Sequence, residues 1–154
     1  MTVSPVPTGY HTLTPYLIVD GATRALAWYA DAFGATEVMR LPAPGGRIGH
    51  AEIEIGDSRI MLADEAPAHD AKAPAAFGGS PVSLHLYVAD VDATMAKAVA
   101  AGGTAKSQPE EKFYGDRLGS LIDPFGHTWH ISTHIEDVTH AEIERRMAAM
   151  SGSP

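Results

Sequence analysis

The sequence predicts an α+β fold made of two tandem copies of one module, a strand, a helix and then further strands, with a C-terminal helix after them. Two observations support this class. A strand-like segment that runs into a helical pattern occurs twice, and strands with hairpin signals follow each occurrence. The chain has 154 residues, which is enough for one domain with a sizeable core.

The repeat aligns without gaps over the first part of each module. At a shift of 69 residues the following pairs superpose: Thr14 and Ser83, Leu17 and Leu86, Val19 and Val88, Gly34 and Gly103. Farther along, a shift of 70 residues aligns Arg47 with Arg117 and Gly49 with Gly119. Self-similarity of this kind indicates that each half is the same structural unit.

Each module begins with a strand and a helix. Residues 15–19 and 82–88 are rich in β-branched and aromatic side chains in alternation, as strands require. In residues 23–33 and 91–101 apolar side chains recur at helical spacing, and a glycine follows each segment. Glycine readily adopts the left-handed conformation that ends a helix, so both segments are predicted helices.

Short strands follow each helix as a meander. Alternating segments flank the turn signals Gly56-Asp57 and Asp123–Gly126. The predicted strands are 50–55, 58–63, 118–122 and 128–134.

The rest of the chain completes the predicted organisation. Residues 64–80 are rich in Ala, Pro and Gly and are predicted to form a loop. Thr139 precedes Glu142 at the spacing of a capping box, so a helix begins there and docks on the body or on a partner subunit. The predicted parts are a first βαβββ module, a linker, a second βαβββ module and a C-terminal helix, at 10–66, 67–80, 81–135 and 136–150.

Composition excludes several partners. The chain carries 11 Lys and Arg against 19 Asp and Glu, a net charge of −8, and such a surface repels phosphate backbones and anionic lipids. No segment approaches the roughly 20 apolar residues that span a bilayer, and the N-terminus lacks the features of a secretory signal. We therefore expect a cytoplasmic protein that binds neither nucleic acid nor membranes. With no Cys, any metal would be held by His and carboxylate ligands.

Histidine side chains are predicted to gather on the polar face of the second module. Strand parity puts His85 on one face with Ser83 and Tyr87, and it puts His130 and His134 on the polar face of the last strand. If the two strands lie close together, His85 and His130 would share a divalent ion or serve as catalytic groups. The alternative is that the two imidazoles are only hydrogen-bonded or solvated.

Other candidate residues have a functional and a structural interpretation. Tyr16, Tyr87 and Tyr114 would line a pocket for a flat ligand, whereas aromatic residues on strands are also good sheet formers. Arg117, next to Asp116, would orient a polar substrate through its guanidinium group, or else form a salt bridge that holds a loop in place.

Several further residues are expected to be structural. Asp64 and Glu65 are predicted to be solvated surface, and Trp28 and Trp129 are core candidates because they face the helices. His50, at the start of a strand, is expected to make local hydrogen bonds.

Seven short phrases of the sequence together carry a resemblance. They are Thr14–Ala22, Trp28-Tyr29, Ala32–Ala35, Gly49–Glu52, Met61–Glu65, Tyr114–Arg117 and Asp123–Trp129. With the duplicated module, they are similar to the vicinal oxygen chelate superfamily, which includes glyoxalases, bleomycin-resistance proteins and extradiol dioxygenases. Within it they resemble the PhnB-like, glyoxalase-related branch. The likeness covers about residues 12–146.

The resemblance implies two curved mixed sheets whose concave faces form a cavity, and a homodimer. In metal-dependent members, two side chains from each module hold one divalent ion that acts as a Lewis acid. The corresponding positions are Thr14, Ser83, His130 and Ile60, or Met61 if the register moves by one. Of these only His130 is a good ligand, because the hydroxyls bind weakly and Ile60 and Met61 offer no hard donor. We expect no metal, or one ion displaced to His85 and His130 with water and Glu52 or Glu54.

Two functions remain open. The first is a glyoxalase-like lyase or isomerase that acts on a small oxygenated molecule in the cavity, with His130 and His85 as general base or ligand. The second is a bleomycin-resistance-like protein that sequesters a small molecule or antibiotic without chemistry, for which the negative charge favours a cationic or aromatic guest. A purely structural module is a third interpretation, and it leaves the polar faces without a role.

Overall fold

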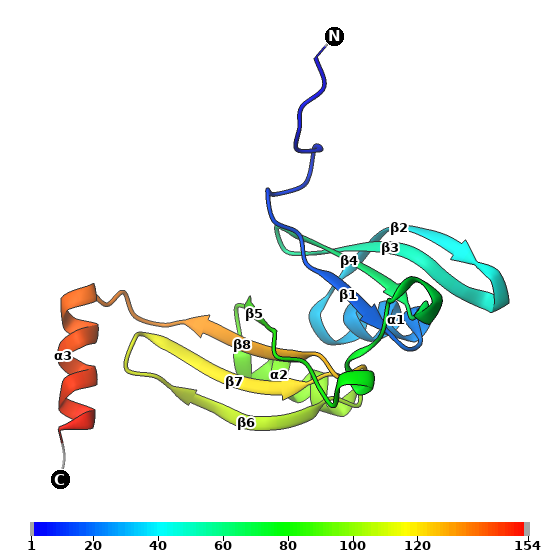
Figure 1. Cartoon of the computed structure of the whole chain (residues 1–154). Coiled ribbons are helices and arrows are strands. Elements are labelled where there is room, and N and C mark those ends of the chain that lie inside the picture. The colour runs from blue at the N-terminus through cyan, green and yellow to red at the C-terminus, as the bar shows by residue number, and fades with distance from the viewer. Residues whose placement is uncertain (1, 153–154) are drawn as a thin grey trace. The chain divides into compact units, whose positions relative to one another are not determined.

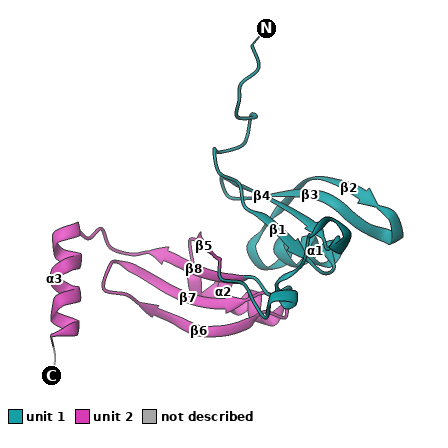
Figure 2. Cartoon of the chain, viewed as in Figure 1, with its two compact units in different colours: residues 1–81, 124–127 teal, residues 82–123, 128–154 magenta. Residues whose placement is uncertain are grey.

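The structure, a computed structural model, describes residues 2–152 (Figure 1). Over this range the chain has eight strands in two four-stranded sheets and three α-helices. It divides into two compact units, shown in Figure 2. The first unit runs to Pro81 and includes Pro124–His127, and the second holds Val82–Asp123 and the chain from Thr128 onward. The predicted α+β class with two repeated modules is confirmed.

The first unit is one strand–helix–strands module. Its elements are β1 Tyr16–Val19, α1 Ala22–Phe33, β2 Thr36–Ala43, β3 Arg47–Ile55 and β4 Ser58–Asp64. The strand order is β1-β4-β3-β2, in which β1 is parallel to β4 and the other pairs are antiparallel.

The second unit repeats this topology. Its elements are β5 Ser83–Tyr87, α2 Val91–Ala100, β6 Thr104–Glu111, β7 Asp116–Ile122, β8 Thr128–His134 and α3 His140–Ser151. The strand order is β5-β8-β7-β6, with β5 parallel to β8.

Each sheet buries one face against its own helix. In the first unit Val19 and Leu62 are fully buried and α1 contacts β2, β3 and β4. In the second unit Ile131 is fully buried and α2 contacts β6, β7 and β8. Trp28 and Trp129 are both buried, which confirms their prediction as core residues. The alternation of side chains along each strand therefore leaves the opposite face free for polar residues.

The sequence pattern did not predict the positions of strands β2 and β6. Both lie at a sheet edge, both are mostly exposed, and each contains a proline, Pro42 or Pro109. An edge strand tolerates proline because one side of its backbone needs no partner, and it needs no apolar face. The period-2 signal is therefore absent where the strand is least buried.

Strand pairing corrects the alignment of the two modules in one place. Tyr16 pairs with Met61 and Met61 with Glu52, while His85 pairs with His130 and His130 with Ser120. Glu52 is thus the counterpart of Ser120. The shift of 70 residues, which aligned the glycines of β3 and β7, is therefore wrong for these strands. The same pairing makes Met61, not Ile60, the counterpart of His130.

Asp64 is buried, so its prediction as solvated surface is wrong. Its Oδ1 accepts hydrogen bonds from the backbone N–H groups of Gly21 and Ala22, both at 2.9 Å, and its Oδ2 accepts from Ile48 at 2.8 Å. Gly21 has no capping side chain of its own, so Asp64 of β4 caps α1 from a distant part of the sequence. In the second unit Thr133 accepts from Val91 at the start of α2 in the same way, at 2.9 Å.

The segments around the modules are also ordered by local contacts. The predicted linker contains two short 3-10 helices, Pro67–His69 and Pro74–Phe77. Thr139 caps α3 as predicted, by accepting from the Glu142 N–H. Arg146 ties α3 to the rest of its unit through the Phe113 carbonyl, at 2.9 Å. None of the helices within residues 2–152 is long and apolar enough to cross a membrane.

We predict that replacement of Asp64 by Ala lowers the free energy of unfolding by about 2–4 kcal/mol, because three backbone donors lose a charged acceptor. Urea denaturation followed by circular dichroism measures the change. The matched control is Thr133→Ala, where a neutral cap is lost and about 1 kcal/mol is expected. Equal losses in the two variants would contradict this account.

Candidate functional site

The second sheet carries a row of polar side chains across three strands. His85 of β5 pairs with His130 of β8, and His130 pairs with Ser120 of β7. Residues that pair across strands point to the same face of a sheet, so these three side chains lie side by side. The two imidazole ring centroids are 6.0 Å apart. The structure thus brings together the two histidines that the sequence singled out.

Each imidazole is held by one serine. His85 Nε2 is hydrogen-bonded to Ser132 Oγ at 2.8 Å, and His130 Nδ1 is hydrogen-bonded to Ser120 Oγ at 2.6 Å. Ser132 and Ser120 are buried. Within residues 2–152 the second nitrogen of each ring, His85 Nδ1 and His130 Nε2, has no hydrogen-bond partner. These nitrogens are available to a bound molecule.

A second network lies one row along the same face. Tyr87 donates its hydroxyl to Asp116 Oδ2 at 2.9 Å, and His134 Nδ1 is hydrogen-bonded to Asp116 Oδ1 at 2.8 Å. His134 Nε2 also contacts Asp137, at 2.8 Å. Asp116 is buried, so two neighbours satisfy a carboxylate that would otherwise be costly to bury. The Tyr87 and His85 rings are 4.9 Å apart, which connects the two networks.

The two networks shift their histidines in opposite directions. Burial, and then the positive charge available to His130, lower the pKa of His85, with Asp116 acting weakly against them. Hydrogen bonds to Asp116 and Asp137 raise the pKa of His134. His85 is therefore biased towards the neutral imidazole, whereas His134 is biased towards the cation.

The other predicted residues of the second unit lie at different places. Ser83 is on the histidine face, at the start of β5, where it is exposed and pairs with Thr128. Tyr114 is in the turn before β7 and packs edge-on against the Phe113 ring, at 5.3 Å. Arg117 makes a two-pronged salt bridge with Asp92 of α2, at 2.7 and 2.8 Å, on the helix side of the sheet. Arg117 is thus not grouped with the histidines.

The remaining predicted residues belong to the first unit. Thr14 precedes β1, and Tyr16 is the first residue of β1. The Tyr16 hydroxyl is 2.8 Å from His50 Nδ1, and His50 Nε2 is 2.7 Å from Glu52 Oε2. The bond to Glu52, two positions away, confirms the local hydrogen bonding expected of His50, whereas the bond to Tyr16, 34 positions away, was not predicted.

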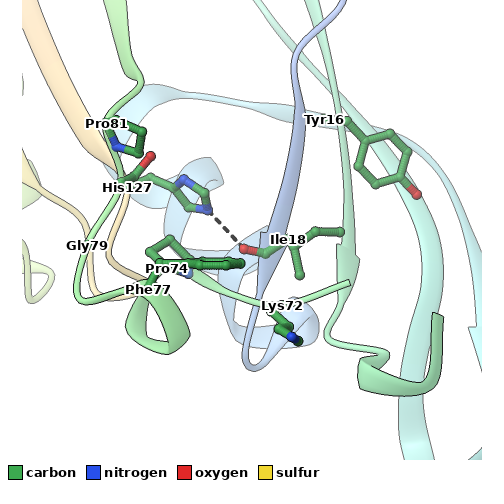
Figure 3. A pocket seen from close by; sticks show the side chains of 9 residues that line it. Tyr16, Ile18, Lys72, Pro74, Phe77, Gly79, Pro81 and His127 are labelled. Carbon is green, nitrogen blue, oxygen red and sulfur yellow. Dashed lines mark hydrogen bonds between the residues drawn. The ribbon is translucent and has the colours of Figure 1, made fainter. Parts of the chain in front are cut away.

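The first unit also contains a cavity of about 250 Å³ beside β1 (Figure 3). Tyr16, Lys72 and Phe77 are among its lining residues. His127 Nε2 is 2.9 Å from the Ile18 carbonyl oxygen, drawn as a dashed line in Figure 3. The figure shows the Tyr16 hydroxyl directed away from Phe77 and His127, so only the side of its ring borders the cavity.

Comparison with protein families decides the identity of the fold. The family model of the Glyoxalase/Bleomycin resistance protein/Dioxygenase superfamily matches residues 10–131. The chain belongs to this superfamily. A relative, protein Mb0911c of Mycobacterium bovis, is 39% identical over 140 residues, covering 89% of this chain and 92% of that protein.

Solved structures show the same glyoxalase fold. Protein PA1353 from Pseudomonas aeruginosa matches with a TM-score of 0.66 and 24% identity, over 82% of this chain and 99% of that one. A PhnB protein from Bacillus cereus matches with a TM-score of 0.62 and 17% identity, over 80% of this chain and 99% of that one. At these identities the likeness concerns the fold alone.

The metal-ligand set of metal-dependent superfamily members does not fit the residues present. The ligand positions hold Thr14 and Met61 in the first unit and Ser83 and His130 in the second. Two neutral hydroxyls and a thioether replace the hard donors that a divalent ion needs. In the part of the chain that the structure describes, no group of three or more His, Asp or Glu side chains is placed to hold an ion.

Sequence reasoning found the two histidines but missed their support. Ser120 was not singled out, and neither was the hydrogen-bonded chain from Tyr16 through His50 to Glu52. Parity along β3 puts His50 and Glu52 on one face, but parity does not say which residue of β1 meets them. That contact depends on the order of strands in the sheet.

We predict that His130→Asn raises the pKa of His85, because the substitution removes a group that can carry positive charge near it. Two-dimensional NMR titration of the imidazole resonances measures this pKa. His69→Asn, at an exposed site in the first unit, is the matched control and leaves the His85 titration unchanged. An unchanged His85 pKa in His130→Asn would show that the two rings do not interact.

We also predict that His134 stabilises the fold more at low pH than at high pH. Its folded pKa is raised, so its contribution is complete below the ordinary value of about 6.5 and is lost as pH rises through the folded value. The difference in melting temperature between the wild type and His134→Gln should be largest near pH 5.5 and shrink towards pH 9. A constant or growing difference would contradict the assignment.

Proposed function

We propose that this superfamily member binds a small organic molecule on the polar face of the second sheet, without a complete metal-ligand set, and that His85 and His130 contact it. The single observation that carries this proposal is the pair of imidazoles, each held through one nitrogen by a buried serine. Such an arrangement orients the second nitrogen of each ring outward and restricts its rotation. Preorganised groups of this kind bind a ligand at a smaller entropic cost.

The chemistry available at this face is proton transfer and hydrogen bonding. A neutral imidazole carries one donor and one acceptor nitrogen, so each outward nitrogen offers a proton or a lone pair, according to the tautomer. The lowered pKa of His85 favours the neutral ring and supports a role as general base. A lyase or isomerase reaction would use this ring to remove a proton from the carbon next to a carbonyl group.

Binding without chemistry is the second candidate, in the manner of a bleomycin-resistance protein. Tyr87 is 60% exposed and its ring lies against His85, so the face offers an aromatic surface for stacking. The net charge of −8 favours a cationic guest. In this case the histidines orient the ligand and transfer no proton.

We predict that His130→Ala abolishes turnover or weakens binding at least about tenfold, since one oriented hydrogen bond of a buried ligand contributes on the order of 1.4 kcal/mol. The screen uses 2-oxoaldehyde adducts of thiols and cationic aromatic antibiotics, and it measures product formation and affinity separately. The matched control is His69→Ala. Product formation that is lost in His130→Ala identifies an enzyme, whereas loss of affinity with no product in the wild type identifies a binding protein.

Measurements of metal binding distinguish an ion displaced to His85 and His130 from a function that needs no metal. Protein purified without chelator is tested by elemental analysis and by thermal shift with nickel, manganese, iron and zinc. An ion held by His85 and His130 raises the melting temperature of the wild type and not of His130→Ala. Activity or binding that survives a chelator supports the proposal, and its loss would overturn the statement that no complete ligand set is needed.

A further inference from the structure

A chain of three polar side chains runs along the polar face of the first sheet, from an exposed residue to a buried one. The Tyr16 hydroxyl lies 2.8 Å from His50 Nδ1, and His50 Nε2 lies 2.7 Å from Glu52 Oε2. The side chain of Glu52 is 8% exposed and that of His50 is 24% exposed, whereas Tyr16 is 48% exposed. The carboxylate is therefore the inner end of the chain and the phenol is the outer end.

The order of groups determines the position of the protons. An ionised carboxylate only accepts hydrogen bonds. His50 Nε2 therefore carries a hydrogen and donates the hydrogen bond to Glu52. In the neutral imidazole Nδ1 is then a lone pair, and it accepts the Tyr16 O–H. A carboxylate that orients an imidazole, which in turn accepts a proton from a hydroxyl, is the arrangement by which enzymes activate a weak nucleophile or acid.

The second sheet provides an internal comparison. The counterpart of Glu52 is Ser120 and, two residues earlier on each strand, the counterpart of His50 is Leu118. The module thus folds without this chain of side chains. Glu52 also retains one buried oxygen, Oε1, that has no hydrogen-bond partner among residues 2–152. A buried acceptor without a partner destabilises the fold, so stability alone does not explain Glu52 at this place.

Tyr16 needs the assistance that His50 can give. Burial raises the pKa of the Tyr16 phenol above its ordinary value, so the free hydroxyl holds its proton more firmly than in water. The other charged pair on this face, Glu54 and Arg59, is joined by a hydrogen bond of 2.8 Å and offers Tyr16 no base.

We propose that Tyr16, His50 and Glu52 form a proton relay, a second acid–base site that is separate in residues from the His85–His130 pair. Tyr16 is the catalytic residue, and it contacts a small molecule whose carbonyl or enol oxygen exchanges a proton. His50 and Glu52 act through Tyr16 and are positioning residues. When the phenol oxygen receives the proton of the ligand's enol, its own proton passes to His50 Nδ1, and Glu52 stabilises the imidazolium. The reverse movement returns a proton to the enolate oxygen, so no covalent bond to the ligand forms or breaks.

Acetylation by N-acetylimidazole tests the relay without knowledge of the natural ligand. In this reaction the Tyr16 oxygen bonds to the acetyl carbon and the bond from that carbon to the imidazole nitrogen breaks. His50 takes the phenol proton and releases it to water, and the departing imidazole takes up a proton from water. Mass spectrometry of peptides measures the rate at Tyr16 in the full chain. We expect His50→Gln to slow it at least about tenfold, a conservative figure beside the roughly 10²–10⁴-fold that general acid–base catalysis typically contributes. We expect Glu52→Gln to slow it as well.

The pH dependence of the Tyr16 acetylation rate separates a proton relay from a purely structural role of His50. A structural role would leave the shape of this pH dependence unchanged. With the relay the wild-type rate depends on His50 as the base and levels off as pH rises, whereas in His50→Gln it keeps rising towards the alkaline range in which phenols ionise, at about pH 10 and above. Equal rates and profiles in wild type and His50→Gln would overturn the relay. An unchanged rate in Glu52→Gln would remove Glu52 from it.

A double variant separates loss of the relay from loss of folding. His50→Leu with Glu52→Ser copies the residues of the second sheet, so the module retains a residue pair that this fold accommodates. We expect an unchanged or higher melting temperature together with slow acetylation of Tyr16. Fast acetylation in this folded variant would contradict the proposal. His69→Ala, at an exposed position of the same unit, should leave the Tyr16 rate unchanged. The acetylation rate of Tyr16 involves no side chain of the second sheet, so the relay and the proposed function of that sheet fail independently.

Discussion

The constraint on which both modules depend is the need to satisfy the backbone N–H groups at the start of each helix. Asp64 and Thr133, at the ends of β4 and β8, accept from Ala22 and Val91 at the starts of α1 and α2. Each contact connects the last strand of a module to its helix, so the helix is held over one face of the sheet. Burial alone would raise the pKa of Asp64, but three backbone donors and Arg47 outweigh it and hold this pKa low.

This arrangement commits one face of each sheet and leaves the other free. The helix-facing positions are apolar in both modules, as Leu62 and Ile131 show, because they form the core. The opposite positions differ: Tyr16, Met61 and Glu52 in the first sheet correspond to His85, His130 and Ser120 in the second. Since the fold makes little demand on this face, a duplicated module can carry two different sets of polar groups.

Sequence patterns predicted the parts of the structure that depend on near neighbours. Alternation along β5 and β8 placed His85 and His130 on one face, and pairing then joined them. The edge strands β2 and β6 were not predicted, because their exposed side chains and the prolines Pro42 and Pro109 leave no alternation of apolar and polar residues. Asp64 was assigned to the surface because its three donors come from Gly21, Ala22 and Ile48, far from it in sequence. Contacts of that kind require the fold.

The way in which each imidazole is held separates the two faces chemically. His50 is held by the carboxylate of Glu52, which stabilises a positive charge when the ring receives a proton. His85 and His130 are held by the neutral hydroxyls of Ser132 and Ser120, which orient the rings without stabilising their charged forms. The first sheet therefore presents a hydroxyl, an imidazole and a carboxylate joined in one hydrogen-bonded chain. The second is suited to present two oriented imidazoles to a ligand, and burial, followed by the positive charge available to His130, lowers the pKa of His85.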